Sequence, residues 1–241
     1  MDAVSVIVTR GEPGAAETAA RIEEMGHIPI VSPALELVSS AEIKIPDLQD
    51  ASGLVFTSAN GVRFFAHRSD DRQLTAWCVG PATAEAARRA GFHRVGESKG
   101  DAAELAQFIL ASTDVTSRPL LHIANAAAKG NLKASLEQAG QPVIFCPLYK
   151  AERASSLSPK LERLLANKQP ALLLVHSEKG ARAFLELAHD WSPTYLTGIA
   201  ISPTVGEVLT QAGLTKTYVA KAPNETELLN ALQNAISDFQ Q

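Results

Sequence analysis

The chain has 241 residues, of which 46% are hydrophobic and 20% charged, and its formal net charge at pH 7 is −4. This length suits one large or two small domains, and the composition is typical of a folded globular protein. The acidic balance gives no reason to expect a nucleic-acid partner, and without a long apolar run or a secretion signal we expect a cytoplasmic protein with no membrane contact.

Strands and helices are expected to alternate along the whole chain. Short β-branched apolar runs predict buried parallel strands, and apolar residues at helical spacing predict helices. The strands are expected at 4–8, 28–31, 53–57, 77–79, 94–96, 119–123, 143–150, 171–175, 199–201 and 217–220. The helices are expected at 15–25, 62–67, 81–90, 101–110, 129–138, 158–167, 181–189, 203–212 and from 224 onward, with an extended segment at 34–50. Such alternation with short loops indicates parallel sheets covered by helices on both faces.

One unit of the chain occurs twice. Residues 77–92 read as a strand, a Gly-Pro turn and an Ala-rich helix, and residues 199–214 have the same order. In both copies a proline opens the helix and a glycine ends it, at positions 122 residues apart. The two glycines, Gly91 and Gly213, suit the left-handed residue just past a helix end. A repeat of this kind predicts two similar domains.

The order of the matching segments predicts how the two domains are assembled. Ser58 matches Ser177, but the segment at 136–147 has its match at the N-terminus, at 22–33. One domain must therefore be inserted into the other. We predict a discontinuous α/β lobe of residues 1–33 plus 151–241, an inserted α/β lobe of residues 38–147, and linker strands at about 34–37 and 148–153. These crossings are expected to pair as a two-stranded hinge beside a cleft, and clefts between domains are favoured ligand sites.

Known catalytic and cofactor motifs are missing. The sequence has no GxGxxG, no GxxxxGK[ST] and no GxSxG, which excludes the common dinucleotide, P-loop and nucleophile-elbow fingerprints. The six histidines have no metal-ligand spacing, so we expect no metal and no cofactor. Cys78 and Cys146 lie in apolar runs and are interpreted as buried free thiols.

Four strand-to-helix turns carry small hydroxyl residues. In a parallel α/β lobe these turns lie at the carboxyl ends of the strands, where helix N-termini offer free N–H groups to carboxylates or phosphates. Ordinary capping of the helices is the alternative. The residues singled out as binding an anionic substrate are Thr57, Ser58 and Ala59; Gly80, Ala82 and Thr83; Ser177 and Glu178; and Ser202 and Thr204.

The chain resembles the uroporphyrinogen-III synthase family over almost its whole length. The resemblance rests on the order and spacing of segments 6–10, 55–62, 79–84 and 140–149, together with the turns at Ser177 and 202–204. It implies two parallel-sheet, three-layer α/β lobes of the HemD-like, flavodoxin-like type, joined by a two-stranded β linker, with one lobe discontinuous. Many relatives have an Arg-Gly pair where this chain has Asn125-Ala126, which weakens any binding role for that loop.

The resemblance also implies a reaction. The substrate would be hydroxymethylbilane, a linear tetrapyrrole with eight carboxylates, and the enzyme would be a lyase of heme biosynthesis that removes water, closes the macrocycle and inverts ring D through a spirocyclic intermediate without a metal or cofactor. Tyr149 matches a tyrosine beside the family's cleft and would assist departure of the hydroxyl, or else only pack its ring at the hinge. Arg10 would bind a substrate carboxylate, or else form a salt bridge within its own lobe.

The remaining expectations concern partners. We expect a monomer that receives its substrate by transient hand-over from hydroxymethylbilane synthase. The alternative is a bilobed binding or sensor protein for a small anion without catalytic activity, or an inactive paralogue.

Overall fold

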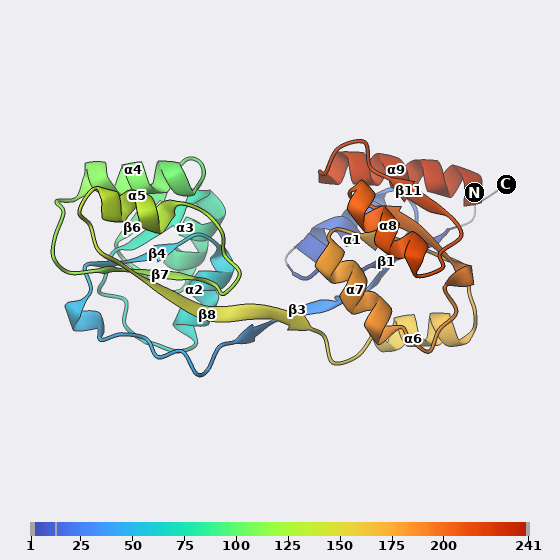
Figure 1. Ribbon diagram of the computed structural model, residues 1–241, viewed down its shortest axis with the longest axis horizontal. Coiled ribbons are helices and arrows are strands. Elements are labelled where there is room, and N and C mark those ends of the chain that lie inside the picture. Colours follow the sequence, from blue (N-terminus) through green and yellow to red (C-terminus); the bar gives the residue numbers. More distant parts are fainter. Residues whose placement is uncertain (1–2, 13, 240–241) are drawn as a thin grey trace. The chain divides into compact units, whose positions relative to one another are not determined.

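The computed structural model describes residues 3–12 and 14–239 and divides the chain into two compact units (Figure 1). One unit runs up to Glu36 and resumes at Glu152, and we call it the discontinuous lobe. The other comprises Leu37–Ala151, and we call it the inserted lobe. Each lobe has its own hydrophobic core, and each cluster of buried side chains found among the described residues belongs to one lobe.

The discontinuous lobe is a five-stranded parallel sheet between two layers of helices. Its strands, in spatial order, are β2 (Ile28–Val31), β1 (Ser5–Val8), β9 (Ala171–Val175), β10 (Leu196–Ala200) and β11 (Thr217–Val219). One face packs against α1 (Gly14–Glu24) and α9 (Glu225–Phe239), and the other against α6 (Pro159–Ala166), α7 (Glu178–Leu187) and α8 (Pro203–Gln211). Strand β9 shows why both faces are covered, because its leucines alternate between the two cores.

The inserted lobe has the same three layers. Its strands, in spatial order, are β6 (Val95–Ser98), β5 (Ala76–Val79), β4 (Gly53–Phe56), β7 (Leu120–Asn125), β8 (Val143–Arg153) and β3 (Leu35–Ser39). Helices α2 (Ala59–Ala66) and α3 (Gly80–Arg89) cover one face, and α4 (Ala102–Ser112) and α5 (Leu132–Gln138) the other. Short 3-10 turns at η1 (Leu48–Asp50) and η2 (Pro193–Tyr195) precede β4 and β10.

The two sheets share one strand order once the permutation is taken into account. The order β2-β1-β9-β10-β11 in the discontinuous lobe corresponds to β8-β7-β4-β5-β6 in the inserted lobe. Both follow the flavodoxin-like order 2-1-3-4-5. The predicted fold class, two parallel-sheet α/β lobes with one of them discontinuous, is confirmed.

Two neighbouring strands carry the chain from one lobe to the other. Strand β3 passes the boundary at Glu36 and Leu37, and β8 passes the boundary at Ala151 and Glu152. The two strands are adjacent in the sheet, as expected for the two crossings. Tyr149, one of the residues singled out in the sequence, lies in β8.

Local chemistry explains where several elements begin and end. Gly91 and Gly213 have φ angles of +94° and +93°, so both occupy the left-handed position predicted for them. A Cβ on Gly61 would lie 2.8 Å from the carbonyl oxygen of Ile123, so only glycine allows α2 to lie this close to β7. Several predicted boundaries differ from the structure: for example, the strands expected at 94–96 and 199–201 are β6 (Val95–Ser98) and β10 (Leu196–Ala200), and the helix expected from residue 129 begins at Leu132.

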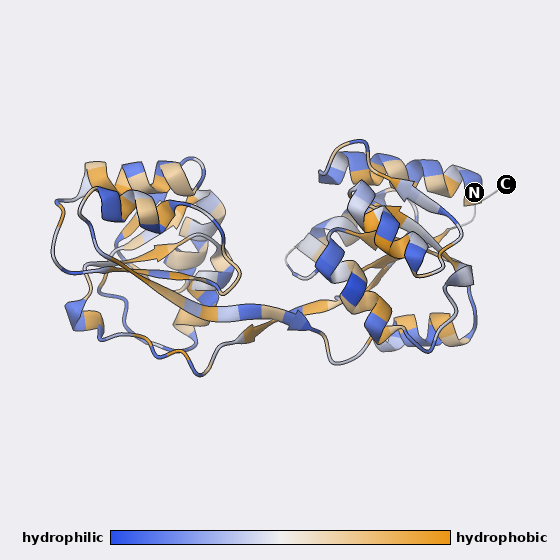
Figure 2. Ribbon diagram, viewed as in Figure 1, coloured by the Kyte–Doolittle hydropathy of each residue, from blue (hydrophilic) through white to orange (hydrophobic). Residues whose placement is uncertain are grey.

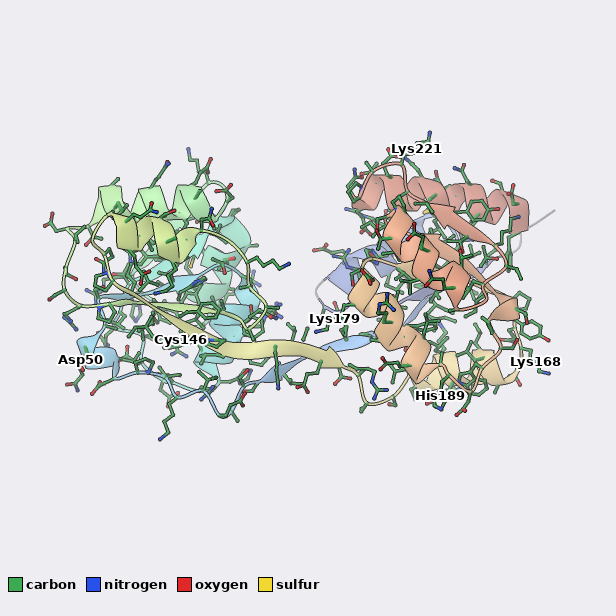
Figure 3. The ribbon with its side chains drawn as sticks, in the orientation of Figure 1. Asp50, Cys146, Lys168, Lys179, His189 and Lys221 are labelled. Carbon is green, nitrogen blue, oxygen red and sulfur yellow. The ribbon has the colours of Figure 1, made fainter. Side chains whose placement is uncertain are left out.

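Hydropathy follows the layers. In Figure 2 the strands are mainly hydrophobic and the outer helices alternate between hydrophobic and hydrophilic residues. Both cysteines are free and buried as predicted, Cys78 in β5 and Cys146 in β8 (Figure 3). Among the described residues, none of the helices combines the length and apolar character needed to cross a membrane.

Candidate functional site

Tyr149 and Ser58 form a hydroxyl pair in the inserted lobe. Ser58 follows β4, Tyr149 lies in β8, and their hydroxyl oxygens are 2.9 Å apart. The Tyr149 ring stacks on Phe64 of α2, with centroids 4.7 Å apart and an angle of 4° between the planes. The backbone of Tyr149 is fixed as well, because the N–H of Ala126 donates to its carbonyl at 2.8 Å. These contacts hold the phenol in one orientation.

The surroundings of Tyr149 keep its phenol protonated. Only 4% of the residue is exposed, and burial raises its pKa above the usual value near 10, while the hydrogen bond with Ser58 opposes part of this effect. The Ser58 oxygen also accepts a hydrogen bond from the N–H of Gly61 at 3.4 Å. Ser58 can therefore direct its own proton to the phenol oxygen, which leaves the Tyr149 proton for another acceptor.

Thr57 lies beside a pocket on the opposite face of the same sheet. Its hydroxyl is 3.3 Å from Nε2 of His122, a residue of β7 that is 7% exposed. Burial lowers the pKa of His122 to about 4, so the ring is neutral near pH 7. The pocket has a volume of about 250 Å³, and Lys129 and Lys133 line its rim. Lys133 is paired with Glu137, so the ammonium of Lys129, with a neutral imidazole and a hydroxyl, is what suits this pocket to an anionic group.

The three serines of the predicted turns are helix caps. The hydroxyl oxygen of Ser58 accepts from Gly61, that of Ser177 from Gly180 and that of Ser202 from Val205. Each bond satisfies one of the free N–H groups at the helix start and leaves the others available. Ala59, Glu178 and Thr204 stand in the first turns of these helices, where the N–H groups are free.

The other turn residues lie differently from one another. Gly80 has a φ angle of +72° and opens α3, Ala82 is exposed, and Thr83 is 5% exposed and faces the inside of the lobe. The carboxylate of Glu178 is paired with Arg182, at 2.9 Å on the helix surface. Of these four residues, Ala82 and Glu178 are exposed and Gly80 is half-buried, whereas Thr83 is enclosed.

Arg10 takes part in a four-residue cluster of the discontinuous lobe. Its Nη1 donates to Oε2 of Glu225 at 2.9 Å, and the same oxygen accepts from Nε2 of His176 at 3.1 Å. The Thr18 hydroxyl donates to Oε1 of Glu225 at 2.6 Å. The hydrogen bond from His176 is the main cause that lowers the pKa of Glu225 to about 2, and the bond from Thr18 and the charge of Arg10 act in the same direction. The salt bridge considered as the alternative role for Arg10 is therefore present.

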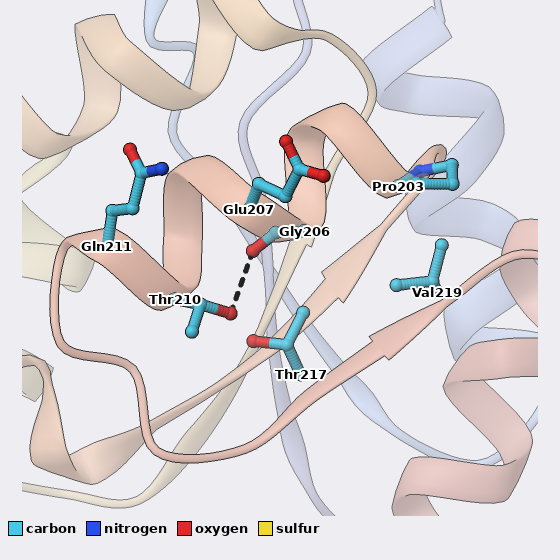
Figure 4. Close-up of a pocket in the computed structure, with 7 residues that line it drawn as sticks. All are labelled: Pro203, Gly206, Glu207, Thr210, Gln211, Thr217 and Val219. Atoms are coloured by element: carbon cyan, nitrogen blue, oxygen red, sulfur yellow. Dashed lines mark hydrogen bonds between the residues drawn. The ribbon is translucent and has the colours of Figure 1, made fainter.

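A second groove, of about 400 Å³, lies between α8 and β11 (Figure 4). Thr210 donates its hydroxyl proton to the Gly206 carbonyl at 2.9 Å at the base of this groove. The lining residues include the carboxylate of Glu207 and no cationic side chain. The groove is therefore a poor place for a substrate with many carboxylates.

Several residues of these clusters were not predicted from the sequence. His122, His176 and Glu225 lie far along the chain from their partners, and Phe64 was assigned only to a helix. Strand order was the missing information: β1 and β9 are adjacent, so Arg10 and His176, which follow them, lie at the same edge of the sheet. The sequence singled out Arg10, but its pairing with Glu225 and His176 could be recognised only from the strand order.

The comparisons with known proteins agree on one family. The family model described as "Uroporphyrinogen-III synthase HemD" matches residues 16–230. The uroporphyrinogen-III synthase of Chlorobaculum parvum is 31% identical over 90 residues, which is 34% of this chain and 37% of that protein. The match thus spans little more than a third of the curated relative.

One solved structure shows the same fold. The crystal structure of uroporphyrinogen-III synthetase from Helicobacter pylori has a TM-score of 0.59 at 17% identity, covering 97% of this chain and 100% of that one. A mutant uroporphyrinogen III synthase from Thermus thermophilus has a TM-score of 0.44 at 16% identity, covering 99% of each chain. Since the family model covers most of the sequence, and the first of these structures shares the fold, the chain belongs to the uroporphyrinogen-III synthase family.

Proposed function

We propose that this protein converts hydroxymethylbilane into uroporphyrinogen III, with loss of water and inversion of ring D through a spirocyclic intermediate. Membership of the uroporphyrinogen-III synthase family identifies the reaction class, a lyase of tetrapyrrole biosynthesis. The observation that carries the chemistry is the buried phenol of Tyr149, which is hydrogen-bonded to Ser58 and keeps its proton.

Tyr149 is the group that assists departure of the substrate hydroxyl. When that hydroxyl leaves as water, it needs one proton or a strong hydrogen bond at its oxygen, and the linear tetrapyrrole becomes a resonance-stabilised cation. A phenol whose oxygen accepts from Ser58 can donate its own proton to the departing oxygen. The substrate approaches the hydroxyl end of the side chain, because Phe64 covers a face of the ring.

Positioning supplies the rest of the acceleration. The cation is then attacked by the substituted carbon of ring D, the spirocyclic intermediate reopens, and the last ring bond forms with loss of a pyrrole proton. Each of these steps depends on how the two ends of the substrate are held. In this proposal the carboxylates bind to free N–H groups at the starts of α2, α3, α7 and α8, to the Arg10 side chain and to the pocket lined by Lys129.

The proposal includes the setting of the enzyme. It acts as a monomer in the cytoplasm, uses no metal or cofactor, and takes its substrate from hydroxymethylbilane synthase. The two free, buried thiols of Cys78 and Cys146 suit a reducing compartment.

An isomer assay tests the proposed reaction. Hydroxymethylbilane is generated from porphobilinogen by its deaminase, the protein is added, and the oxidised porphyrins I and III are separated. We expect isomer III to dominate in the presence of the protein and isomer I in the control without it. Isomer I alone, from a sample shown to be folded by circular dichroism, would exclude the synthase activity and favour an anion-binding protein.

A further inference from the structure

We propose that Glu225 is a positioning residue that holds the Arg10 side chain through one nitrogen and leaves the rest of its guanidinium as a fork for a single carboxylate of the substrate. The inference rests on the proposed function for the identity of that carboxylate. The inference combines the two roles considered for Arg10, which were carboxylate binding and a salt bridge within its lobe. The salt bridge to Glu225 orients the guanidinium that binds the carboxylate.

The hydrogen bonds of Arg10 use only one of its three nitrogens. Nη1 donates to Glu225 at 2.9 Å and to the Thr18 hydroxyl at 3.4 Å. Within residues 3–12 and 14–239, Nε and Nη2 have no hydrogen-bond partner. An arginine presents Nε and Nη2 in a planar arrangement that matches the two oxygens of a carboxylate. The Arg10 side chain is 33% exposed, so it is open to a ligand.

Glu225 is itself fixed more firmly than a surface carboxylate. Its two oxygens accept from Thr18, Arg10 and His176, and its side chain is 22% exposed. It also stands in the first turn of α9, where the helix dipole favours a negative charge. An exposed ion pair contributes little to stability and adopts several geometries. The hydrogen bonds to Glu225, in contrast, come from three separate segments of the chain and hold it in one geometry.

His176 has no other hydrogen-bonding task. Because a carboxylate only accepts hydrogen bonds, the ring donates from Nε2. Nδ1 is buried, and among the described residues it has no hydrogen-bond partner. In the part of the chain that the structure describes, the hydrogen-bond partner of this side chain, which is 12% exposed, is thus Glu225. A buried imidazole that serves one carboxylate is expected where that carboxylate must keep its place.

Gly14 provides the space that the fork occupies. A Cβ at this position would lie 2.3–2.4 Å from Cζ, Nη2 and Nε of Arg10. Gly14 is the first residue of α1 and is buried. An alanine at position 14 would therefore push the guanidinium aside without changing any charge, which gives a second and independent way to disturb Arg10.

Three variants and one control test the inference. Glu225→Gln removes the charge that holds Nη1, Gly14→Ala displaces the guanidinium, and Arg10→Met removes it. The control Asp238→Asn removes an acidic residue from the same helix, where Asp238 is paired with Lys216 on the surface. The measurements are KM and kcat with hydroxymethylbilane, the Kd for uroporphyrin III by fluorescence titration, and the midpoint of thermal unfolding.

We expect Glu225→Gln and Gly14→Ala each to raise KM and Kd about tenfold, the value of one charge-assisted hydrogen bond, with kcat changed less than about twofold. In the Arg10→Met background, Glu225→Gln should have no further effect on Kd, and Asp238→Asn should behave as the wild type. Unchanged KM and Kd in a folded Glu225→Gln variant, or an undiminished effect of that substitution without Arg10, would overturn the inference.

The two proposals fail in different ways. If the wild type makes no isomer III but binds uroporphyrin III with a Kd that depends on Glu225, the synthase activity is excluded and the carboxylate fork stands. If isomer III forms and no variant changes KM or Kd, the activity stands and the Glu225 pair is only structural. Absence of any uroporphyrin III binding by the wild type would count against the fork.

Discussion

At the scale of single residues, the proposed chemical step depends on the phenol of Tyr149. Tyr149→Phe keeps the ring that stacks on Phe64 and removes only the hydroxyl bonded to Ser58. We expect turnover to fall about 10²-fold, as is typical when one general acid is lost, with thermal stability nearly unchanged. The matched control is Tyr195→Phe, which removes the hydroxyl of an exposed tyrosine in the other lobe. The isomer assay measures both, and a turnover equal to that of the wild type would remove Tyr149 from the mechanism.

His122 makes the inserted lobe sensitive to mild acid. Its pKa is lowered from 6.5 to about 4 in the folded state by burial, so between these pH values the unfolded chain binds the extra proton. The contribution of neutral His122 to the free energy of unfolding is therefore fully present above pH 6.5. It falls by up to about 3 kcal/mol as the pH drops toward 4. Urea unfolding at pH 7 and pH 5 measures the loss. In His122→Asn, whose side chain does not titrate, the difference between the two pH values should shrink, and an unaltered difference would refute this assignment.

At the residue level, the sequence singled out individual side chains where a local signal existed, but it did not show which of them lie together. Ser58 and Tyr149 were both singled out, one from a strand end and one from the family resemblance, but the 2.9 Å bond between them depends on β4 and β8 flanking β7. The roles assigned to the turn residues remain predictions. Glu225 gave no signal, because its partner Arg10 is 215 residues away in the chain and an acidic residue opening a helix is common.

At the scale of elements, the serine-capped turns can be tested for anion binding. Ser177 caps α7, and Ser177→Ala should lower the free energy of unfolding by about 1 kcal/mol. Ser177→Asp caps a helix as well as serine does but adds a negative charge beside the free N–H groups. We expect this variant to keep its stability and to raise KM, because the proposed substrate carries carboxylates.

The control for this charge is Thr194→Asp, which places the same charge on an exposed residue before β10, at the opposite end of the sheet. Chemical denaturation measures the capping role of Ser177, and steady-state kinetics measures whether the turn binds the substrate. If Ser177→Asp has the KM of the wild type, the hydroxyl of this turn is a cap and nothing more.

Element types were predictable because the chain alternates strongly patterned strands and helices, whereas boundaries depended on side chains that hold loops. The helix expected from residue 129 begins only at Leu132, because Asn125 organises the preceding turn. Its side-chain oxygen accepts from the N–H of Ala127, and its backbone carbonyl accepts from the N–H of Ala128. An asparagine side chain that bonds to the following backbone N–H groups stabilises a turn at the expense of a helix, and the sequence does not reveal which of the two forms. The short strand at 94–96 is displaced to β6 by pairing with β5.

At the scale of the whole molecule, the permuted repeat was the most informative feature of the sequence. The matches between 22–33 and 136–147 required one lobe to be inserted into the other, and the equivalent strand orders of the two sheets follow from it. The boundaries at Glu36 and Ala151 could not be read so closely, because β3 and β8 continue through them as regular strands. A composition shift marks a flexible linker, but paired strands have the composition of the sheets that they extend.

Separate cores predict separate unfolding of the lobes, and the chain has one tryptophan in each. Trp77 lies in the core of the inserted lobe, and Trp191 packs against a core of the discontinuous lobe. In Trp191→Phe, fluorescence during urea unfolding should follow the inserted lobe, and in Trp77→Phe the discontinuous lobe. We expect two midpoints at pH 7, of which only the one reported by Trp77 moves markedly at pH 5, since His122 belongs to that lobe. Coincident transitions that shift together with pH would show instead that the lobes unfold as one cooperative unit, despite the division of the core clusters.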